Sequence, residues 1–350
     1  MPYALYAEKT KSLGRTTVYL AGEITNAEAA QKLANEVGPN TESIIIVNTT
    51  ALTSATIDGV TDLRNVIIEN NSALQSVTIN TVKSIYEQFS VIGCPNLLNL
   101  TLNNLEKAGG TIGIGNSNSN PNFAFAMPNL VKIDCFSMGM SAKNITLPSL
   151  TSITTLSNSG FSASQSINLS ALTTIKGTGL SFRAAAIDVT SLTTASTVSF
   201  TGINLATLNL NALTSGNIGL SSTGLTQLTI PNLTIGGLHV TSNSALTQIS
   251  VPNLVTFDAQ NPGFNIENNS HLTQLSFPSV ATIINYANIL LRNNALPSTT
   301  VNGILHDLLD LTQSGYSPYI NGQIPSAPPT GQGIIDKQTL IGQGNSIYTD

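Results

Sequence analysis

Short alternations of apolar and polar residues recur along most of the chain. One copy is Leu228-Thr-Ile230-Pro-Asn-Leu233, in which two apolar residues flank a polar one and a Leu closes the motif. Such alternation has the period of a strand with one buried face. Eleven copies occur, and their closing Leu or Val residues stand at positions 60, 82, 105, 130, 150, 172, 192, 213, 233, 254 and 280. The regular spacing of about 22 residues predicts a repeat architecture.

Most copies are followed by a second apolar run. Examples are 66–68, 180–182, 198–200, 238–240, 264–266 and 289–291. A coil of two strands cannot bury its apolar side alone, whereas coils stacked about 4.8 Å apart pair their strands and share one core. We therefore predict a mainly β fold: a right-handed solenoid of about eleven leucine-rich coils of about 22 residues, with a small α/β cap at each end.

The extent of the repeat predicts three regions. They are an N-terminal cap or attachment segment at 1–40, the leucine-rich solenoid at 41–297 and a C-terminal α/β cap at 298–350. Near the start, Thr25-Asn-Ala-Glu28 has the form of a capping box, which predicts a helix over 26–37 after a strand at 17–20. Residues 1–24 do not resemble the repeat, so they are either an attachment segment or a simple cap.

The C-terminal region changes period after residue 296. Ser298 or Thr299 can cap a helix whose apolar stripe is Val301, Ile304, Leu305 and Leu308. A short strand at 319–322, a helix near 337–341 and a last strand at 346–349 are expected to follow.

Asparagines recur at the bends between coils. Asn70, Asn243, Asn268 and Asn293 each follow a second apolar run. An asparagine amide can bond the backbone of a bend, and stacked asparagines can also bond one coil to the next. We expect these four residues to form a structural ladder.

Charge is scarce and unevenly placed. Only 9% of residues are charged and the net charge is −5, whereas a typical soluble domain has about 25% charged residues. No Asp, Glu, Lys or Arg occurs between Asp188 and Asp258. So few basic residues argue against nucleic-acid binding, and no apolar run is long enough to insert in a membrane. The N-terminus has no signal-peptide pattern.

Candidates for chemistry are few. His239, His271 and His306 have no Cys or His at metal-ligand spacing, so we expect no metal and no cofactor. Cys94 and Cys135 are expected to be buried thiols. Asp258 and Glu267 are the only acid pair in the later coils that would suit glycoside hydrolysis. We therefore expect no enzyme activity.

One polar row is a candidate ligand face. The residue after the closing Leu is Thr in five successive coils, namely Thr151, Thr173, Thr193, Thr214 and Thr234. Stacked threonines stabilise a sheet, and a flat threonine face also suggests ice binding. Because the row is single and the next position is irregular, ice binding is a minor alternative.

The repeat resembles known leucine-rich proteins. Copies such as Leu225-Thr-Gln-Leu-Thr-Ile-Pro-Asn-Leu233 look like the leucine-rich repeat of bacterial and viral surface proteins, and the two-strand form is similar to the L domain of growth-factor receptors and fungal wall proteins. The C-terminal region resembles a module of phage and bacterial-surface leucine-rich proteins. The shared residues are Val301-Asn-x-Ile304-Leu305, Gly322, Ala327-Pro-x-Thr330-Gly331 and Leu340-x-Gly342-x-Gly344, although Asn345 stands where the module has a bulky aromatic residue.

These resemblances imply a surface role without catalysis. The first hypothesis is a structural and recognition protein on a phage virion: a fibre, spike or receptor-binding component. It would attach to other virion proteins through its N-terminal segment and bind a host protein or glycan; a homo-oligomer is compatible with it. The alternative is a secreted or surface-anchored bacterial adhesin.

Overall fold

The computed structural model describes residues 13–115, 120–258, 264–284 and 289–350 of the chain. Its contacts divide the chain into two compact units. Unit 1 comprises Met1–Leu130 with Met140–Ala142, and unit 2 comprises Val131–Gly139 with Lys143–Asp350. Both units are β-solenoids of parallel strands about 22 residues apart, and their coils number about 12 in all. The prediction of a mainly β solenoid is confirmed.

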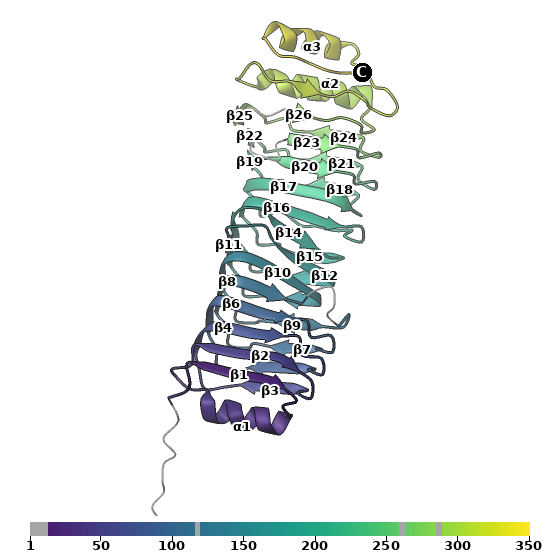
Figure 1. Ribbon diagram of the computed structural model, residues 1–350. Helices are drawn as coiled ribbons and strands as arrows, with labels where there is room; N and C mark the ends of the chain where they lie inside the picture. Colours follow the sequence, from purple (N-terminus) through teal and green to yellow (C-terminus); the bar gives the residue numbers. More distant parts are fainter. Residues whose placement is uncertain (1–12, 116–119, 259–263, 285–288) are drawn as a thin grey trace, which may run out of the picture. The chain divides into compact units, whose positions relative to one another are not determined.

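Unit 1 contains two rows of parallel strands (Figure 1). The strands that carry the repeat motif are here called motif strands, and those after the closing Leu or Val are called second strands. The second strands are β1 (Thr17–Gly22), β2 (Ser43–Thr49), β4 (Asp62–Glu69), β6 (Ser84–Ile92) and β8 (Lys107–Ile114). The motif strands are β3 (Ser54–Ile57), β5 (Ser76–Ile79), β7 (Asn99–Thr101) and β9 (Ala124–Ala126). The register stacks like on like: Ile46, Ile68, Val91 and Ile114 are successive partners, all buried.

Unit 2 repeats this arrangement with more interruptions. Its longer strands are β10 (Lys132–Thr146, which also passes through unit 1), β12 (Ser159–Asn168), β16 (Thr194–Gly202) and β17 (Ser215–Thr223). Shorter strands are β11 (Ser152–Thr155), β13 (Thr174–Gly177), β14 (Leu180–Arg183), β15 (Ala186–Asp188), β19 (Ile235–Gly236), β20 (Leu238–Thr241), β22 (Thr256–Asp258), β23 (Phe264–Glu267), β25 (Thr282–Ile284) and β26 (Ile289–Leu290). Inside the coils, Phe161, Phe182 and Phe200 stack with ring centroids 5.4 and 5.5 Å apart.

Three motif strands of unit 2 form a sheet of their own. They are β18 (Gln227–Thr229), β21 (Gln248–Ser250) and β24 (Gln274–Ser276). One predicted copy departs from the pattern: the segment 208–210 is not a strand, although Leu210 is buried. Its apolar residue is kept in the core without a strand pairing.

The predicted N-terminal helix is α1 (Asn26–Glu36), and its capping box is present. The Thr25 N–H donates to Glu28 Oε2 at 2.9 Å, while the Glu28 N–H donates to Thr25 Oγ1 at 3.4 Å. Before the helix, β1 pairs with β2, and Val18 and Leu20 are fully buried. Residues 17–22 are therefore part of the first coil, whereas residues 1–12 of the predicted attachment segment lie outside the described residues.

The C-terminal cap differs in detail from the prediction. The helix α2 (Ser298–Asp307) follows Pro297, which makes no side-chain cap, and continues into the 3-10 turn η1 (Leu308–Asp310). The strand predicted at 319–322 is limited to β27 (Pro318–Tyr319), and the last strand is a single bridge between Tyr319 and Tyr348. The last helix, α3 (Gln332–Gly342), is longer than expected.

A buried asparagine ladder joins the last coils of unit 2. The Asn243 N–H donates to Asn269 Oδ1, and the Asn269 N–H donates to Asn294 Oδ1, both at 3.0 Å. The Nδ2 groups of Asn243 and Asn269 donate to the carbonyl oxygens of Leu220 and Val240. All three asparagines are at most 1% exposed. In unit 1, the Thr49 N–H donates to Asn71 Oδ1, and Asn71 Nδ2 donates to the carbonyl oxygen of Ile46.

The predicted ladder is found in part: Asn243 belongs to the buried ladder, and Asn268 and Asn293 bond coil to coil outside it. Asn243 is in the buried ladder, but Asn70, Asn268 and Asn293 each lie one residue before a ladder asparagine. These three have φ between 56 and 59°, in the left-handed region, which asparagine tolerates better than most residues. Two of them form a weaker exposed contact, in which Asn293 Nδ2 donates to Asn268 Oδ1 at 3.2 Å.

We expect Asn269→Ala to lower the free energy of unfolding of unit 2 by about 3 kcal/mol or more, because it leaves several buried backbone groups without partners, each at a cost of about 1–3 kcal/mol. The neighbouring Asn268→Gly should change it by less than about 1 kcal/mol, since glycine accepts the positive φ. Urea unfolding followed by circular dichroism compares the two variants. Equal losses would show that the ladder is not the stabilising contact.

Candidate functional site

The predicted threonine row lies on unit 2 and bonds coil to coil. The hydroxyls of Thr173, Thr193 and Thr214 donate to the carbonyl oxygens of Thr151, Thr173 and Thr193 at 2.9–3.0 Å. Thr151 and Thr234 make the same bond to Val131 and Thr214. Each of these carbonyl oxygens also accepts the N–H of the same threonine. Because every hydroxyl proton is used inside the protein, the row offers a ligand only oxygen acceptors and methyl groups.

A second polar surface lies on β18, β21 and β24. The middle residue of each strand points into the core, so the outer residues face solvent. The register stacks Gln227, Gln248 and Gln274 in one row and Thr229, Ser250 and Ser276 in another. We call these six residues the Gln/Ser face. The side-chain amides of these three glutamines form no hydrogen bond with another described residue, so they are available to a ligand.

The Gln/Ser face ends in a groove beside α2. The groove has a volume of about 300 Å³ and lies between β21, β24 and the helix. Its polar lining is Gln248, Gln274, Ser276, Thr300 and Asp307, and its apolar lining is Ile249, Leu275 and Pro278. Gly303 of α2 leaves this side of the helix open, since a Cβ added there would meet nothing within 4 Å. Amides, hydroxyls and one carboxyl group thus converge on a single hollow.

Asp307 gives the groove its one acidic group. Its Oδ2 accepts the N–H of Phe277 at 3.3 Å, and the residue is half-buried. Burial raises the pKa of the Asp307 carboxyl above its ordinary range, and the hydrogen bond from Phe277 opposes this shift only in part. The other carboxyl oxygen is able to accept a hydrogen bond from a hydroxyl group in the groove.

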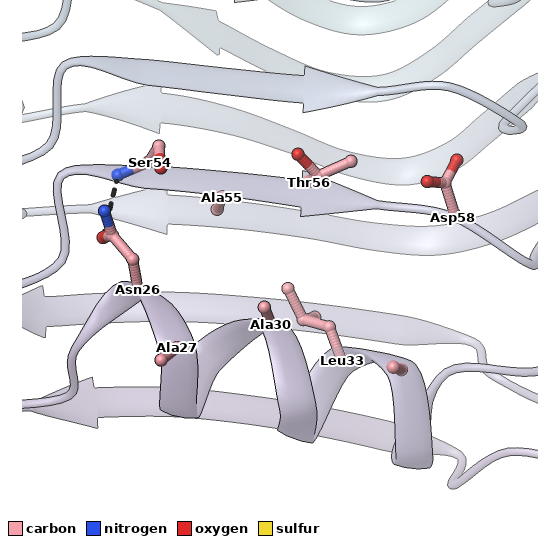
Figure 2. A pocket seen from close by; sticks show the side chains of 9 residues that line it. Asn26, Ala27, Ala30, Leu33, Ser54, Ala55, Thr56 and Asp58 are labelled. Carbon is pink, nitrogen blue, oxygen red and sulfur yellow. Dashed lines mark hydrogen bonds between the residues drawn. The ribbon is translucent and has the colours of Figure 1, made fainter.

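A second groove, of about 490 Å³, lies in unit 1 between α1 and β3 (Figure 2). Its helix side is lined by Ala27, Ala30, Leu33 and Ala34, and its strand side by Ser54, Thr56 and Asp58. The most polar helix residue, Asn26, is already hydrogen-bonded within the protein. Its Oδ1 accepts the N–H groups of Thr53 and Ser54 at 2.8 and 3.2 Å. This groove is mainly a gap between alanines and a strand.

Three of the other predicted candidates have separate partners. Glu267 forms an ion pair with Arg292 at 2.6 Å, His306 lies 3.4 Å from Asp336, and His271 contacts Ser270. Within the described ranges, no three or more His, Cys, Asp and Glu side chains gather as a metal site. The two cysteines are free and buried, as expected, and burial raises the pKa of the Cys135 thiol to about 11.

The Gln/Ser face was not among the predicted sites, although the sequence contains a signal for it. A Thr-Gln pair precedes the first apolar residue of the motif in three coils, at Gln227, Gln248 and Gln274. Its repetition at one register position indicates an outward row.

The sequence matches no protein-family profile and no curated protein. In the described part of the chain, no helix is long and apolar enough to cross a membrane.

We expect Asp307→Asn to stabilise unit 2 near neutral pH. A carboxyl whose pKa is raised by folding favours the folded state most when it is protonated, so stability declines as the pH rises from below the ordinary aspartate pKa through the raised value. Asparagine cannot ionise and keeps an acceptor for Phe277. The melting temperature of the variant should exceed that of the wild type by about 2 °C or more at about pH 7, and the gain should vanish near pH 3.

The exposed Asp134→Asn is the matched control for this measurement. It should leave the pH dependence of melting as it is in the wild type. The interpretation of Asp307 is contradicted if both substitutions have the same effect.

Proposed function

We propose that this protein is a non-enzymatic structural and recognition protein exposed on a phage virion, and that it binds a neutral, hydroxyl-rich ligand such as a host glycan. The observation that carries the binding part is the Gln/Ser face with its groove at α2. Two stacked rows of amides and hydroxyls repeat at the spacing of the strands, which suits a polymer whose own hydroxyls repeat.

The chemistry of the face supports a neutral ligand. Amide and hydroxyl groups both donate and accept, so they can match sugar hydroxyls in either sense. Each such bond contributes about 1 kcal/mol net, and affinity would come from many of them together. Asp307 adds a charged acceptor in the groove, which strengthens a bond from a hydroxyl donor.

The virion assignment rests on the resemblances of the repeat and of the C-terminal region. The same surface would also serve a bacterial adhesin, which is the second candidate function. The two candidates are distinguished by location: immunogold labelling of purified phage particles supports the first, and labelling of intact bacterial cells without phage supports the second.

The binding face can be tested with matched variants of the full chain. Gln248→Ala with Gln274→Ala removes two neighbouring amides at the mouth of the groove. On an array of neutral polysaccharides, this double variant should lose about tenfold or more of the wild-type affinity, since two to three hydrogen bonds are worth about 1.4 kcal/mol or more together.

Thr193→Val with Thr214→Val is the control, because those hydroxyls already donate inside the protein. It should bind as the wild type does. If the threonine variant loses binding and the glutamine variant keeps it, the ligand face is the threonine row.

A further inference from the structure

The groove beside α2 lies at one end of the Gln/Ser face. Gln248 and Gln274 belong both to the glutamine row and to the lining of the groove, so the row leads directly into it. Beyond Gln274, the next element along the row is α2, whose Thr300 Oγ1 donates to the Thr273 carbonyl oxygen at the edge of β24. A ligand that follows the glutamine row across the strands therefore meets the helix at the groove.

Two helices stand across the direction of this row (Figure 1). Thr300 and Asp307 of α2 bond the two residues that flank β24, so the helix runs alongside that strand. Behind α2 lies α3, and the N–H of Thr330, just before α3, donates to Asn302 Oδ1 of α2. A helix with its side chains is about 10–12 Å across, against about 4.8 Å between strands. The helices therefore form a step, and the groove of about 300 Å³ at its foot has room for only a short piece of a ligand.

Asp307 is the hydrogen-bond acceptor at this end of the face. Its Oδ2 accepts the N–H of Phe277 at 3.3 Å, next to Ser276, and its Oδ1 has no hydrogen-bond partner among the described residues. An ionised carboxylate accepts hydrogen bonds but cannot donate them, and a bond to such a charged acceptor is about twice as strong as one between neutral groups. Asp307 therefore favours a ligand group that carries a hydroxyl proton.

The end of a glycan chain differs from its interior in its hydroxyl protons. Inside the chain, each sugar shares the oxygen of its linkage with the next sugar, and this ether oxygen has no proton to donate. The terminal sugar has a free hydroxyl group at the same position, which can donate to Asp307. Interior sugars offer their other hydroxyls to the glutamine row, because an amide both donates and accepts hydrogen bonds. The groove and the row thus suit two different parts of one chain.

We propose that the groove beside α2 binds the free end of a neutral glycan. Asp307 accepts the terminal hydroxyl group, and the glutamine row binds the sugars behind it. This inference rests on the proposed function, because it concerns the same face, and it adds which part of the ligand is recognised.

Competition by chain fragments tests the preference for ends with the full protein. A neutral polysaccharide that binds the wild type on the array is partly hydrolysed in acid, so that the same mass carries about ten times as many chain ends. Added in solution at equal mass, the fragments should compete about tenfold more strongly than the intact polysaccharide, because the number of binding sites follows the number of ends. Equal competition at equal mass overturns the inference, since the interior of the chain would then be bound.

Two matched variants test the part played by Asp307. Asp307→Asn keeps an acceptor for the Phe277 N–H but has no carboxylate in the groove, so its affinity for the fragments should fall about tenfold. Asp310→Asn makes the same charge change at an exposed residue outside the lining of the groove, and it should bind as the wild type does. Equal affinities of the two variants overturn the inference.

The outcomes also separate this inference from the proposed function. A wild-type chain that binds no neutral polysaccharide on the array contradicts the proposed function and this inference with it. Binding without any preference for fragments contradicts the inference alone.

Discussion

The buried asparagine ladder is the contact on which the stacking of the last coils of unit 2 depends. At the bends after β20, β23 and β26 the chain turns with N–H and C=O groups inside the protein, where an unpaired group is costly. One asparagine side chain satisfies several of them and reaches the adjacent coil. The ladder bonds of unit 2 join residues 20, 26 and 25 positions apart. The same asparagine contact is therefore kept in coils of different lengths. The additional residues of the longer coils lie at other bends.

The same stacking explains why the surface is nearly uncharged. Equivalent side chains of neighbouring coils lie about 4.8 Å apart, so a row of like charges would repel itself. Where charges do occur on adjacent coils, they alternate in sign: Arg64 lies between Glu42 and Glu87, at 3.7 and 2.5 Å, and Lys83 pairs with Glu106 at 3.2 Å. In the later coils, rows of neutral hydroxyl and amide groups take the place of these alternating charges. Such groups bind water and do not repel the equivalent groups of the adjacent coil.

The features that follow from the repeat pattern could be predicted from the sequence. The features that depend on local backbone geometry could not. Strand alternation and the capping box of Thr25 and Glu28 gave the solenoid and α1, because both signals are short-range. In an Asn-Asn pair such as Asn268 and Asn269, however, either residue satisfies the polar pattern. Only the backbone decides that the first takes a positive φ and the second turns inward. The groove at Asp307 could not be predicted from the sequence for another reason. It lies between α2 and β24, and the repeat pattern does not say where α2 packs.

The helices α1 and α2 also end the rows of motif strands, which the repeat pattern alone does not explain. A motif row that stops leaves N–H and C=O groups exposed to pairing. At β24, Thr300 Oγ1 donates to the Thr273 carbonyl oxygen at 2.8 Å and Asp307 accepts the Phe277 N–H, so two side chains of α2 take the place of a strand. Asn26 of α1 does the same beside β3. Because a helix is wider than a strand and reaches the sheet only through such side chains, hollows remain between them. The grooves are therefore a consequence of capping, and the one beside α2 gains its polar lining from the residues that close the row.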